Sequence, residues 1–311
     1  MDINSLLNKN LQELCSIADK VRKDNVGDII HIRALLEISN ICYRNCAYCG
    51  LNIANNHLER YAMNTNEIET LGKRACDIGY KTIVLQSGES KHYNINELAD
   101  CVVKLSEYGL TVTLSLGELD YKQLQLLKSA GAKRYLLKFE TADKTLYEKL
   151  HNGYTLDNRL ECLQAIRELG YELGSGFLVG LPNENDESIV KNLQLIQKLR
   201  CDMVGIGVFI PHKYTPLADL PCGDTELTKK CVAITRILLP NCNIPITTSL
   251  GEFGDKYQMF NGGANVIMQN ITPHNLAKNY QIYPKKLELM EFESARKQLE
   301  SDIVKMCKKP L

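Results

Sequence analysis

The feature that most limits the fold of this chain is an alternation of short β-rich runs with amphipathic segments of helical period. Parallel strands need a crossover between them, and that crossover is usually a helix. Several helical segments end in glycine, which favours a helix end ahead of the next strand. The β-rich runs are Ile32–Ile38, Thr82–Ser87, Thr111–Leu116, Arg134–Lys138, Gly174–Val179, Met203–Gly207, Ile244–Thr248 and Asn265–Met268. They predict an α/β fold, a complete (β/α)₈ barrel of the TIM type.

The segments between these runs and at both ends of the chain complete one domain. Helices are expected at Thr65–Asp77, Ile95–Tyr108, Asp120–Ala130, Asp157–Leu169, Glu187–Leu199 and Thr225–Leu239. A leading helix at about Ile3–Val21 is expected to plug one end of the barrel, and Pro284–Lys308 to form one or two outer helices. We predict a single domain over 1–311, with an N-terminal helix in 1–28, the barrel in 29–270 and a C-terminal extension in 271–311.

A barrel of this kind carries its active site where the strands end. Polar segments follow six of the expected strands: the cysteine run 42–49, "SGES" at 87–90, "SLGE" at 115–118, "KFETAD" at 138–143, "FIPHKYTPL" at 209–217 and "TTSLGE" at 247–252. Unrelated polar clusters would not all fall at the same end of the strands. We therefore expect one site, built from several strand ends.

Composition excludes some classes of function. Lysine plus arginine, 37 residues, equals aspartate plus glutamate, 37 residues, whereas a nucleic-acid-binding protein normally has a basic excess. No apolar run is long enough to span a bilayer, and the first residues show no signal region, so a cytoplasmic protein without membrane association is expected. In that compartment, metal binding and packed reduced thiols explain twelve cysteines better than disulfides do.

Cys42, Cys46 and Cys49 form a C-x-x-x-C-x-x-C run with no fourth cysteine at the next step. Soft thiolate ligands select zinc, copper(I) or iron–sulfur clusters. A closed zinc site needs four ligands, and His57 could supply the fourth. A [4Fe–4S] cluster held by three cysteines leaves one iron with an open coordination position, where a small molecule can bind. The three-cysteine cluster is the better match, and the zinc site is the alternative.

With Tyr48 just before its last cysteine, the run resembles the motif of the radical S-adenosylmethionine (SAM) superfamily. The resemblance implies one [4Fe–4S] cluster per chain on these three cysteines, with SAM bound at the open iron. It also implies reductive cleavage of SAM to methionine and a 5′-deoxyadenosyl radical. Stretches such as "KTIVLQSGE", "RYLLKFETAD" and "GANVIMQNITP" narrow the resemblance, from about Ile30 to Pro284, to the [FeFe]-hydrogenase maturases of the HydE family.

The resemblance also implies which residues contact SAM. Tyr48 is expected beside the adenine, and the turn Ser87-Gly88-Glu89 is expected to bind the amino group through backbone oxygens, because glycine allows close approach. Glu140 and Arg159 match residues that hold the polar groups of SAM. Ser115 is expected to face the same cavity. The alternatives are a surface aromatic residue, a strand-ending turn and a surface ion pair. No catalytic side chain is assigned beyond the cluster and SAM.

A second set of residues is assigned to the substrate. Its members are Thr113, Lys138, Thr247, Thr248 and Ser249. The last three match a hydroxyl cluster in the lower part of the family's cavity, and strand-end hydroxyls are the alternative. Lys138 and Phe139 stand where the family commonly has arginine and histidine, and Val208 where it has proline. Lysine keeps the charge but loses bidentate hydrogen bonding. These departures are expected to bear on the substrate rather than on the SAM chemistry.

The resemblance implies a radical SAM enzyme of [FeFe]-hydrogenase H-cluster maturation. Its implied substrate is a small anionic iron complex with cysteine, carbonyl and cyanide ligands, and its implied partners are other hydrogenase maturases and a reductant such as a flavodoxin or ferredoxin. One alternative is a radical SAM enzyme on an ordinary small molecule, such as an amino-acid mutase (methylornithine synthase is one) or a sulfur-inserting enzyme. Sulfur insertion would need further barrel cysteines, and no matching set is evident. A non-catalytic iron–sulfur or zinc protein is the third reading.

Overall fold

The computed structural model describes residues 2–254, 257–284 and 290–311. Its strands are β1 (Ile29–Ser39), β2 (Thr82–Ser87), β3 (Thr111–Ser115), β4 (Arg134–Leu136), β5 (Glu172–Val179), β6 (Met203–Val208), β7 (Pro245–Ile246), β8 (Val266–Asn270) and β9 (Lys309–Pro310). Its longer helices are α2 (Leu11–Val26), α3 (Thr65–Ile78), α4 (Ile95–Glu107), α5 (Tyr121–Ser129), α7 (Leu156–Glu168), α8 (Asp186–Leu199), α9 (Thr225–Leu238) and α12 (Phe292–Lys305). The short ones are α1 (Ile3–Leu7), α6 (Lys144–Leu150), α10 (Thr248–Gly251), α11 (His274–Ala277) and the 3₁₀ helix η1 (Gln258–Asn261).

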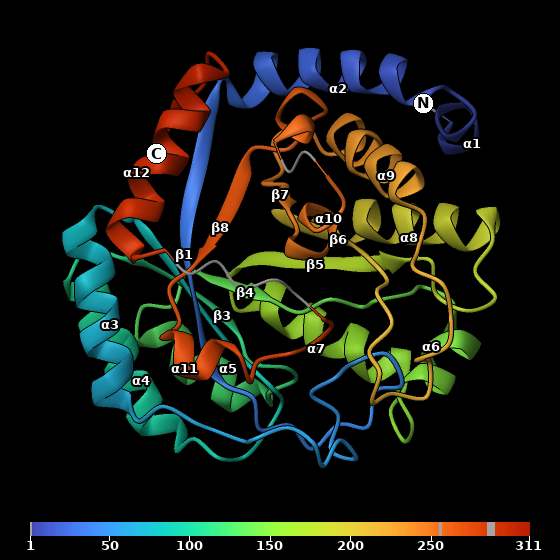
Figure 1. Ribbon diagram of the computed structural model, residues 1–311. Coiled ribbons are helices and arrows are strands. Elements are labelled where there is room, and N and C mark those ends of the chain that lie inside the picture. The colour runs from blue at the N-terminus through green and yellow to red at the C-terminus, as the bar shows by residue number, and fades with distance from the viewer. Residues whose placement is uncertain (1, 255–256, 285–289) are drawn as a thin grey trace.

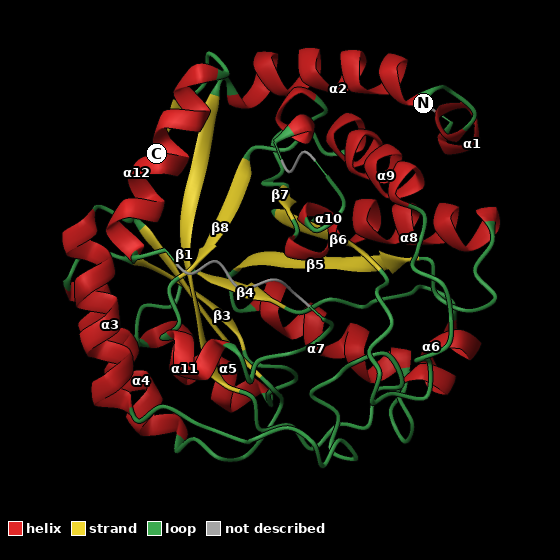
Figure 2. Cartoon of the chain, in the orientation of Figure 1, coloured by secondary structure: helices red, strands yellow, loops and turns green. Residues whose placement is uncertain are grey.

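Strands β1 to β8 form one parallel sheet in the order β6-β5-β4-β3-β2-β1-β8-β7, with helices around it (Figure 2). The ring closes between β6 and the residues before β7 through one isolated parallel bridge, Met203 to Asn243. There the Val204 amide donates to Asn243 O at 3.0 Å, and the Asn243 amide donates to Asp202 O at 2.8 Å. The predicted (β/α)₈ barrel is confirmed.

The two faces of β1 show how the barrel divides its side chains. Alternate residues from Ile30 to Ile38 belong to the hydrophobic core that the strands share with the surrounding helices. The residues between them point to the other face, because side chains alternate along a strand. Arg33 is one of these, and its Nη1 reaches the Met203 sulfur of β6, 2.9 Å away. The barrel interior is therefore more polar than the layer between strands and helices.

The helices begin and end where the sequence supplies caps. Asn64 and Glu67 form a reciprocal capping box at the start of α3, and Gly79 ends that helix with a φ of 107°. Asp120 and Gln123 form the same box at α5. No helix in the described ranges is both long and apolar enough to cross a lipid bilayer.

The leading helix differs from the prediction because it is two helices. Helix α1 ends at Leu7, and α2 restarts after Asn10, whose side chain accepts from the Glu13 amide. Asparagine favours such an N-cap position over a helix interior. Helix α2 lies across the end of the barrel at which the strands begin (Figure 1). There Cys15 and Ala18 pack beside the paired glycines after η1.

Other parts of the chain also differ from the prediction. Strand β7 is only two residues long, because Thr247 leaves the strand and caps α10 with its hydroxyl. Helix α6 was not predicted. In the tail, α12 starts at Phe292, and residues 285–289 of the predicted Pro284–Lys308 helices lie outside the described residues. Strand β9 was also missed, and it pairs with the start of β1.

Candidate functional site

The loop that follows β1 carries the three cysteines and is organised by Arg60. The Arg60 guanidinium donates from Nη1 to the carbonyls of Asn40 and Leu51, both at 2.8 Å, and from Nη2 to those of Asn52 and Asn55, at 2.7 and 3.2 Å. One side chain thus fixes four backbone carbonyls of a segment without regular secondary structure. Sequence analysis did not identify Arg60.

Cys42, Cys46 and Cys49 are all free thiols and each is partly exposed. Burial raises the pKa of Cys42. Burial, then the charge of Cys42, raises the pKa of Cys46 to about 12. Burial, then the charges of Cys46 and Cys42, raises the pKa of Cys49 well above its usual range. The thiols therefore lie close enough to repel one another as anions. Three thiolates here need a cation to stabilise them.

The donor set fits an iron–sulfur cluster better than a single ion. No three His, Cys, Asp or Glu side chains in the described part of the chain converge closely enough to hold one metal ion. His57, the candidate fourth zinc ligand, stacks instead on Tyr214 with ring centroids 4.0 Å apart. Three soft thiolates without a fourth ligand match the three-cysteine cluster.

The turn after β2 packs directly on the cysteine loop. The Gly88 amide donates to Ser39 O, and the Tyr43 amide donates to Glu89 O, each at 2.9 Å. A Cβ on Gly88 would lie 2.8 Å from the Cys42 Cβ and closer still to Ile41 O, so only glycine fits. The turn predicted to bind the SAM amino group thus lies beside the first cysteine.

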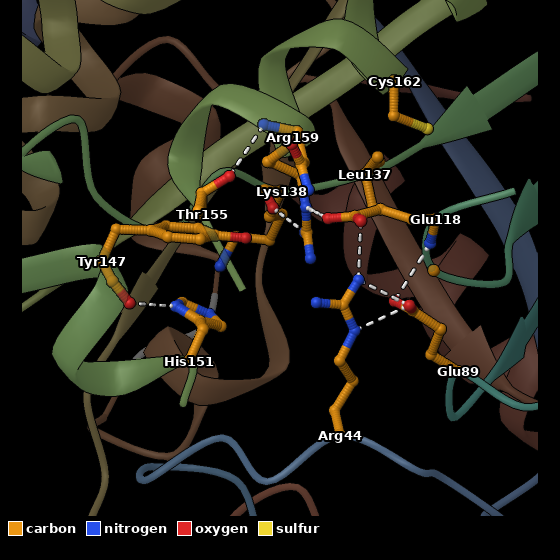
Figure 3. A network of polar contacts seen from close by, with 12 residues as sticks. Arg44, Glu89, Glu118, Leu137, Lys138, Tyr147, His151, Thr155, Arg159 and Cys162 are labelled. Carbon is orange, nitrogen blue, oxygen red and sulfur yellow. Dashed lines mark hydrogen bonds and ion pairs between the residues drawn. The ribbon is translucent and has the colours of Figure 1, made fainter. Parts of the chain in front are cut away.

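Four charged side chains form a buried network behind this turn (Figure 3). Arg44 of the cysteine loop donates to Glu89 Oε1 from Nε and Nη2, at 2.7 and 2.6 Å, and to Glu118 Oε2 at 2.7 Å. Arg159 donates to Glu118 Oε1 at 2.6 Å. Burial alone would raise the pKa of Glu118, but Arg159 and Arg44 outweigh burial and the pKa is lowered. The network links the ends of β1, β2 and β3 to α7.

One donor of this network has no partner among the described residues. Arg44 Nη1 is buried and has no hydrogen-bond partner among the described residues, and the Arg44 guanidinium lies 3.4 Å from the centroid of the Tyr154 ring. Arg159 is held by Glu118 and by Lys138 O, 2.5 Å from its Nη1. These contacts place two guanidinium groups on one carboxylate beside the cysteine loop. A carboxylate ligand such as that of SAM suits this corner.

Glu140 lies at the end of the β4 segment in a left-handed conformation, with φ of 63°. Its amide donates to Gly176 O at 3.1 Å, and its carboxylate accepts from Lys138 Nζ at 2.9 Å. A left-handed φ is uncommon for residues other than glycine and is often found at functional sites. Glu140 and Lys138, predicted for the cofactor and the substrate respectively, are therefore one ion pair.

Tyr48 contacts the segment after α6. Its hydroxyl lies 2.9 Å from His151 Nε2, and its ring packs edge-on to the imidazole. Burial lowers the pKa of His151 to about 3. The side chain between the second and third cysteines is thus fixed by a residue about a hundred positions away, which sequence analysis did not identify.

The barrel interior brings together part of the predicted substrate set. A Cβ on Gly207 would lie 3.1 Å from Ser249 Oγ and 3.7 Å from Lys138 Nζ, so those two groups flank the same glycine. Thr247 donates to Ile206 O at 2.8 Å. Thr113 is fully buried, and its hydroxyl has no partner in the described ranges.

Other predicted residues lie elsewhere. Thr248 is exposed within α10, because the chain turns into a helix where a strand end was expected. Together with Thr247 it lines a cavity of about 1160 Å³ beside α10 and α12, whose described lining does not include the cysteine loop. Phe139 and Val208 both belong to the hydrophobic core, so their departures from the family pattern do not reach the interior. Ser115 is half-buried.

The glycine-rich stretch "GSGFLVG" at 174–180 belongs mostly to β5. A Cβ on Gly176 would lie 2.8 Å from the Gly205 carbonyl carbon and closer to its oxygen. Glycine is therefore required where β5 passes β6.

Comparisons with known proteins agree with this geometry. The family model of the radical SAM superfamily matches residues 36–213. The chain is 46% identical to the [FeFe] hydrogenase maturase subunit HydE of Thermotoga maritima over 91% of this chain and 82% of that protein. It is 29% identical to 3-methylornithine synthase of Methanosarcina acetivorans over 92% of this chain and 83% of that protein.

Solved structures show the same fold. The crystal structure of methylornithine synthase (PylB) has a TM-score of 0.88 at 26% identity and covers 100% of this chain and 93% of that chain. That of HydG, a maturase of the [FeFe]-hydrogenase, has a TM-score of 0.81 at 20% identity and covers 98% of this chain and 71% of that chain. The chain therefore belongs to the radical SAM superfamily, whose enzymes use a [4Fe–4S] cluster and SAM, and within it to the family of the [FeFe] hydrogenase maturase subunit HydE.

Proposed function

We propose that this enzyme acts in the maturation of [FeFe] hydrogenase, on a small anionic iron complex that carries cysteine, carbonyl and cyanide ligands. The observation that carries this proposal is the 46% identity to a hydrogenase maturase subunit over nearly the whole chain. Other hydrogenase maturases, which would supply the complex, and a flavodoxin or ferredoxin reductant are the proposed partners.

The proposed roles of the site residues follow from their positions. When bound, the cluster and SAM supply a 5′-deoxyadenosyl radical. Cys42, Cys46 and Cys49 hold the cluster. The Ser87-Gly88-Glu89 turn and Arg159 hold the amino and carboxylate groups of SAM. The Glu89 side chain is already engaged by Arg44 and Tyr43, so its contribution to SAM comes from its backbone.

The remaining SAM contacts lie on two other segments. Glu140 accepts a polar group of SAM, and Tyr48 packs beside the adenine. Both side chains already have a protein partner, Lys138 and His151. Ser115, at the end of β3, completes the proposed set.

The polarity of the interior supports an anionic substrate. Lys138 and Ser249 flank Gly207, and Thr113 offers a buried hydroxyl without a partner among the described residues. Thr247 adds a hydroxyl beside β6, and Thr248 lines the neighbouring cavity beside α10 and α12. Arg33 lies deeper and is 2% exposed, with Nε unpartnered in the described part of the chain. Donors of this kind replace the water that a buried anion loses.

A radical SAM reaction on an amino acid is the competing function. The observation that favours it is the likeness to methylornithine synthase, which covers the whole chain. The Lys138–Glu140 ion pair is also compatible with a zwitterionic substrate. The two functions therefore differ in the charge of the substrate, which is an anion in the first and a zwitterion in the second.

The test incubates reduced, cluster-loaded protein with SAM and either the cysteine-bound iron complex or a panel of free amino acids. The proposal expects the iron complex, and not the amino acids, to produce a new radical signal and to be consumed. Lys138→Met should weaken the response to the complex, and Lys138→Arg should retain it, because the charge is kept. Stimulation of SAM cleavage by an amino acid, with no response to the complex, would assign the competing function.

A further inference from the structure

The segment after α6 clamps the cysteine loop. The Ala47 amide donates to Leu150 O at 2.8 Å, and Cys46 forms an isolated antiparallel bridge with His151. This backbone pairing brings the imidazole of His151 next to the turn between Cys46 and Cys49. His151 is only 1% exposed, so its polar atoms must find partners within the protein.

The two ring nitrogens of His151 have different partners, and these fix the tautomer. Nδ1 lies 2.8 Å from Tyr147 O, and a carbonyl oxygen can only accept a hydrogen bond. Nδ1 therefore carries the proton, and Nε2 accepts from the Tyr48 hydroxyl, 2.9 Å away. The Tyr147 ring stacks on the imidazole with centroids 3.9 Å apart (Figure 3). The imidazole is held on both its edge and its face.

The same contacts restrict Tyr48. Its ring packs with Ala47 against a small hydrophobic cluster formed by Leu146, Leu150, Leu181 and Phe209. Tyr48 is only half-buried, so packing alone does not fix the plane of its ring. The hydrogen bond to His151 supplies the direction that packing lacks.

We propose that His151 is a positioning residue that holds the Tyr48 side chain, through this single hydrogen bond, in the orientation needed beside bound SAM. The inference rests on the SAM chemistry of the family and on the expected place of Tyr48 beside the adenine. It does not depend on the iron complex, so SAM binding tests it without any substrate.

The structure offers a matched pair of variants. In His151→Asn the amide nitrogen can still donate to Tyr147 O, but the shorter side chain does not reach Tyr48. In His151→Gln the longer side chain can present its amide oxygen to the Tyr48 hydroxyl. Tyr48→Phe removes the same hydrogen bond from the other side.

The experiment measures SAM affinity from the change that SAM causes in the EPR signal of the reduced cluster, with iron content measured in parallel. His151→Asn and Tyr48→Phe should each bind SAM about five- to tenfold more weakly, the effect of one buried hydrogen bond. His151→Gln should restore affinity to near that of the parent. The double variant Tyr48→Phe/His151→Asn should be no weaker than either single variant, because all three lack one shared contact.

Three results would overturn the proposal. Wild-type affinity in His151→Asn would show that the hydrogen bond is not needed. Additive losses in the double variant would show that the two residues act separately. Loss of iron from His151→Asn and His151→Gln alike would show that the imidazole holds the cysteine loop rather than the tyrosine. None of these results bears on the proposed function, because the measurement of SAM affinity uses no iron complex.

Discussion

Gly88 is the point at which the end of β2 meets the cysteine loop. The absence of a side chain there lets Ser39 O accept from the Gly88 amide while Ile41 and Cys42 pass directly over it. The same residue is expected to lie under the SAM amino group. One backbone position thus serves both the cluster and the second cofactor.

Gly88→Ala should prevent correct cluster assembly. The new Cβ would meet the Cys42 Cβ at 2.8 Å as well as Ile41 O, and backbone cannot yield as a flexible side chain can. Iron content after anaerobic reconstitution is the measurement. Gly205→Ala is the control, because a Cβ there meets nothing closer than 3.9 Å. Equal iron in the two variants would contradict the assignment.

At the scale of single residues, the sequence predicted those residues whose chemistry has few alternatives. Three cysteines at this spacing are typical of few kinds of site, and a glycine directly after a strand usually marks a turn or a close backbone contact. The roles of Arg44, Glu118 and His151 could not be found this way, although Glu118 ends the predicted "SLGE" segment. Arginine, glutamate and histidine are common on surfaces, and their partners lie 45, 41 and 103 residues away in the chain. Only the folded barrel brings them together.

The cysteine loop is the element on which the site depends, and it has no hydrogen-bonded ladder of its own. Its carbonyls converge on the guanidinium of Arg60, and the Asn40 side chain links both ends of the loop through Glu59 O and the Tyr61 amide. A planar group with several donors suits this task, whereas an ammonium group cannot reach four carbonyls in the same way.

Arg60→Lys should therefore lower the iron content and raise the proteolytic sensitivity of the loop. Losing two or three hydrogen bonds to a charged donor should cost about 2–4 kcal/mol locally. Arg167→Lys is the matched control, since Arg167 also donates to backbone carbonyls, Leu199 O and Arg200 O, but far from the site. The control should lose global stability and keep its iron. If both variants kept full iron, the loop would not depend on Arg60.

The prediction of helices and strands was wrong where a single capping residue changes the path of the chain. The hydroxyl of Thr247 was a plausible strand end, but it caps α10 and shortens β7. Helix α6 was missed because its seven residues are too few to show a clear helical period. Its Asp143 cap was the one available signal. Both errors lie at the rim, where local caps compete with strand propensity.

At the scale of the whole molecule, the barrel interior is polar where the strands begin as well as at the site. His31 and Arg33 of β1 lie inside, near Arg134 of β4. Burial, with the charges of Arg33 and Arg134, lowers the pKa of His31 to about 4 from 6.5. Folding therefore has to remove a proton from His31 at mildly acidic pH.

This places a pH dependence on the stability of the fold. Between pH 6.5 and about 4 the unfolded chain binds a proton at His31 that the folded chain does not, so the free energy of unfolding should fall as pH falls. The difference between the parent and His31→Gln should amount to roughly 1–3 kcal/mol across this window. Urea unfolding of cluster-free protein at several pH values measures it. If the free energy of unfolding of the two proteins changed with pH in the same way, the lowered pKa of His31 would be contradicted.

The short pairing of β6 with Asn243, just before β7, has a mechanical consequence for the ring. Pro245 has no amide hydrogen, and Thr247 leaves the strand, so this joint cannot lengthen into a ladder. In a closed barrel, the strand pair with the fewest backbone hydrogen bonds separates first when the structure fluctuates. Deuterium should therefore enter the amides of Val204 and Asn243 well before those of β1 and β2, and the wall beside Gly205 is the part of the barrel that yields.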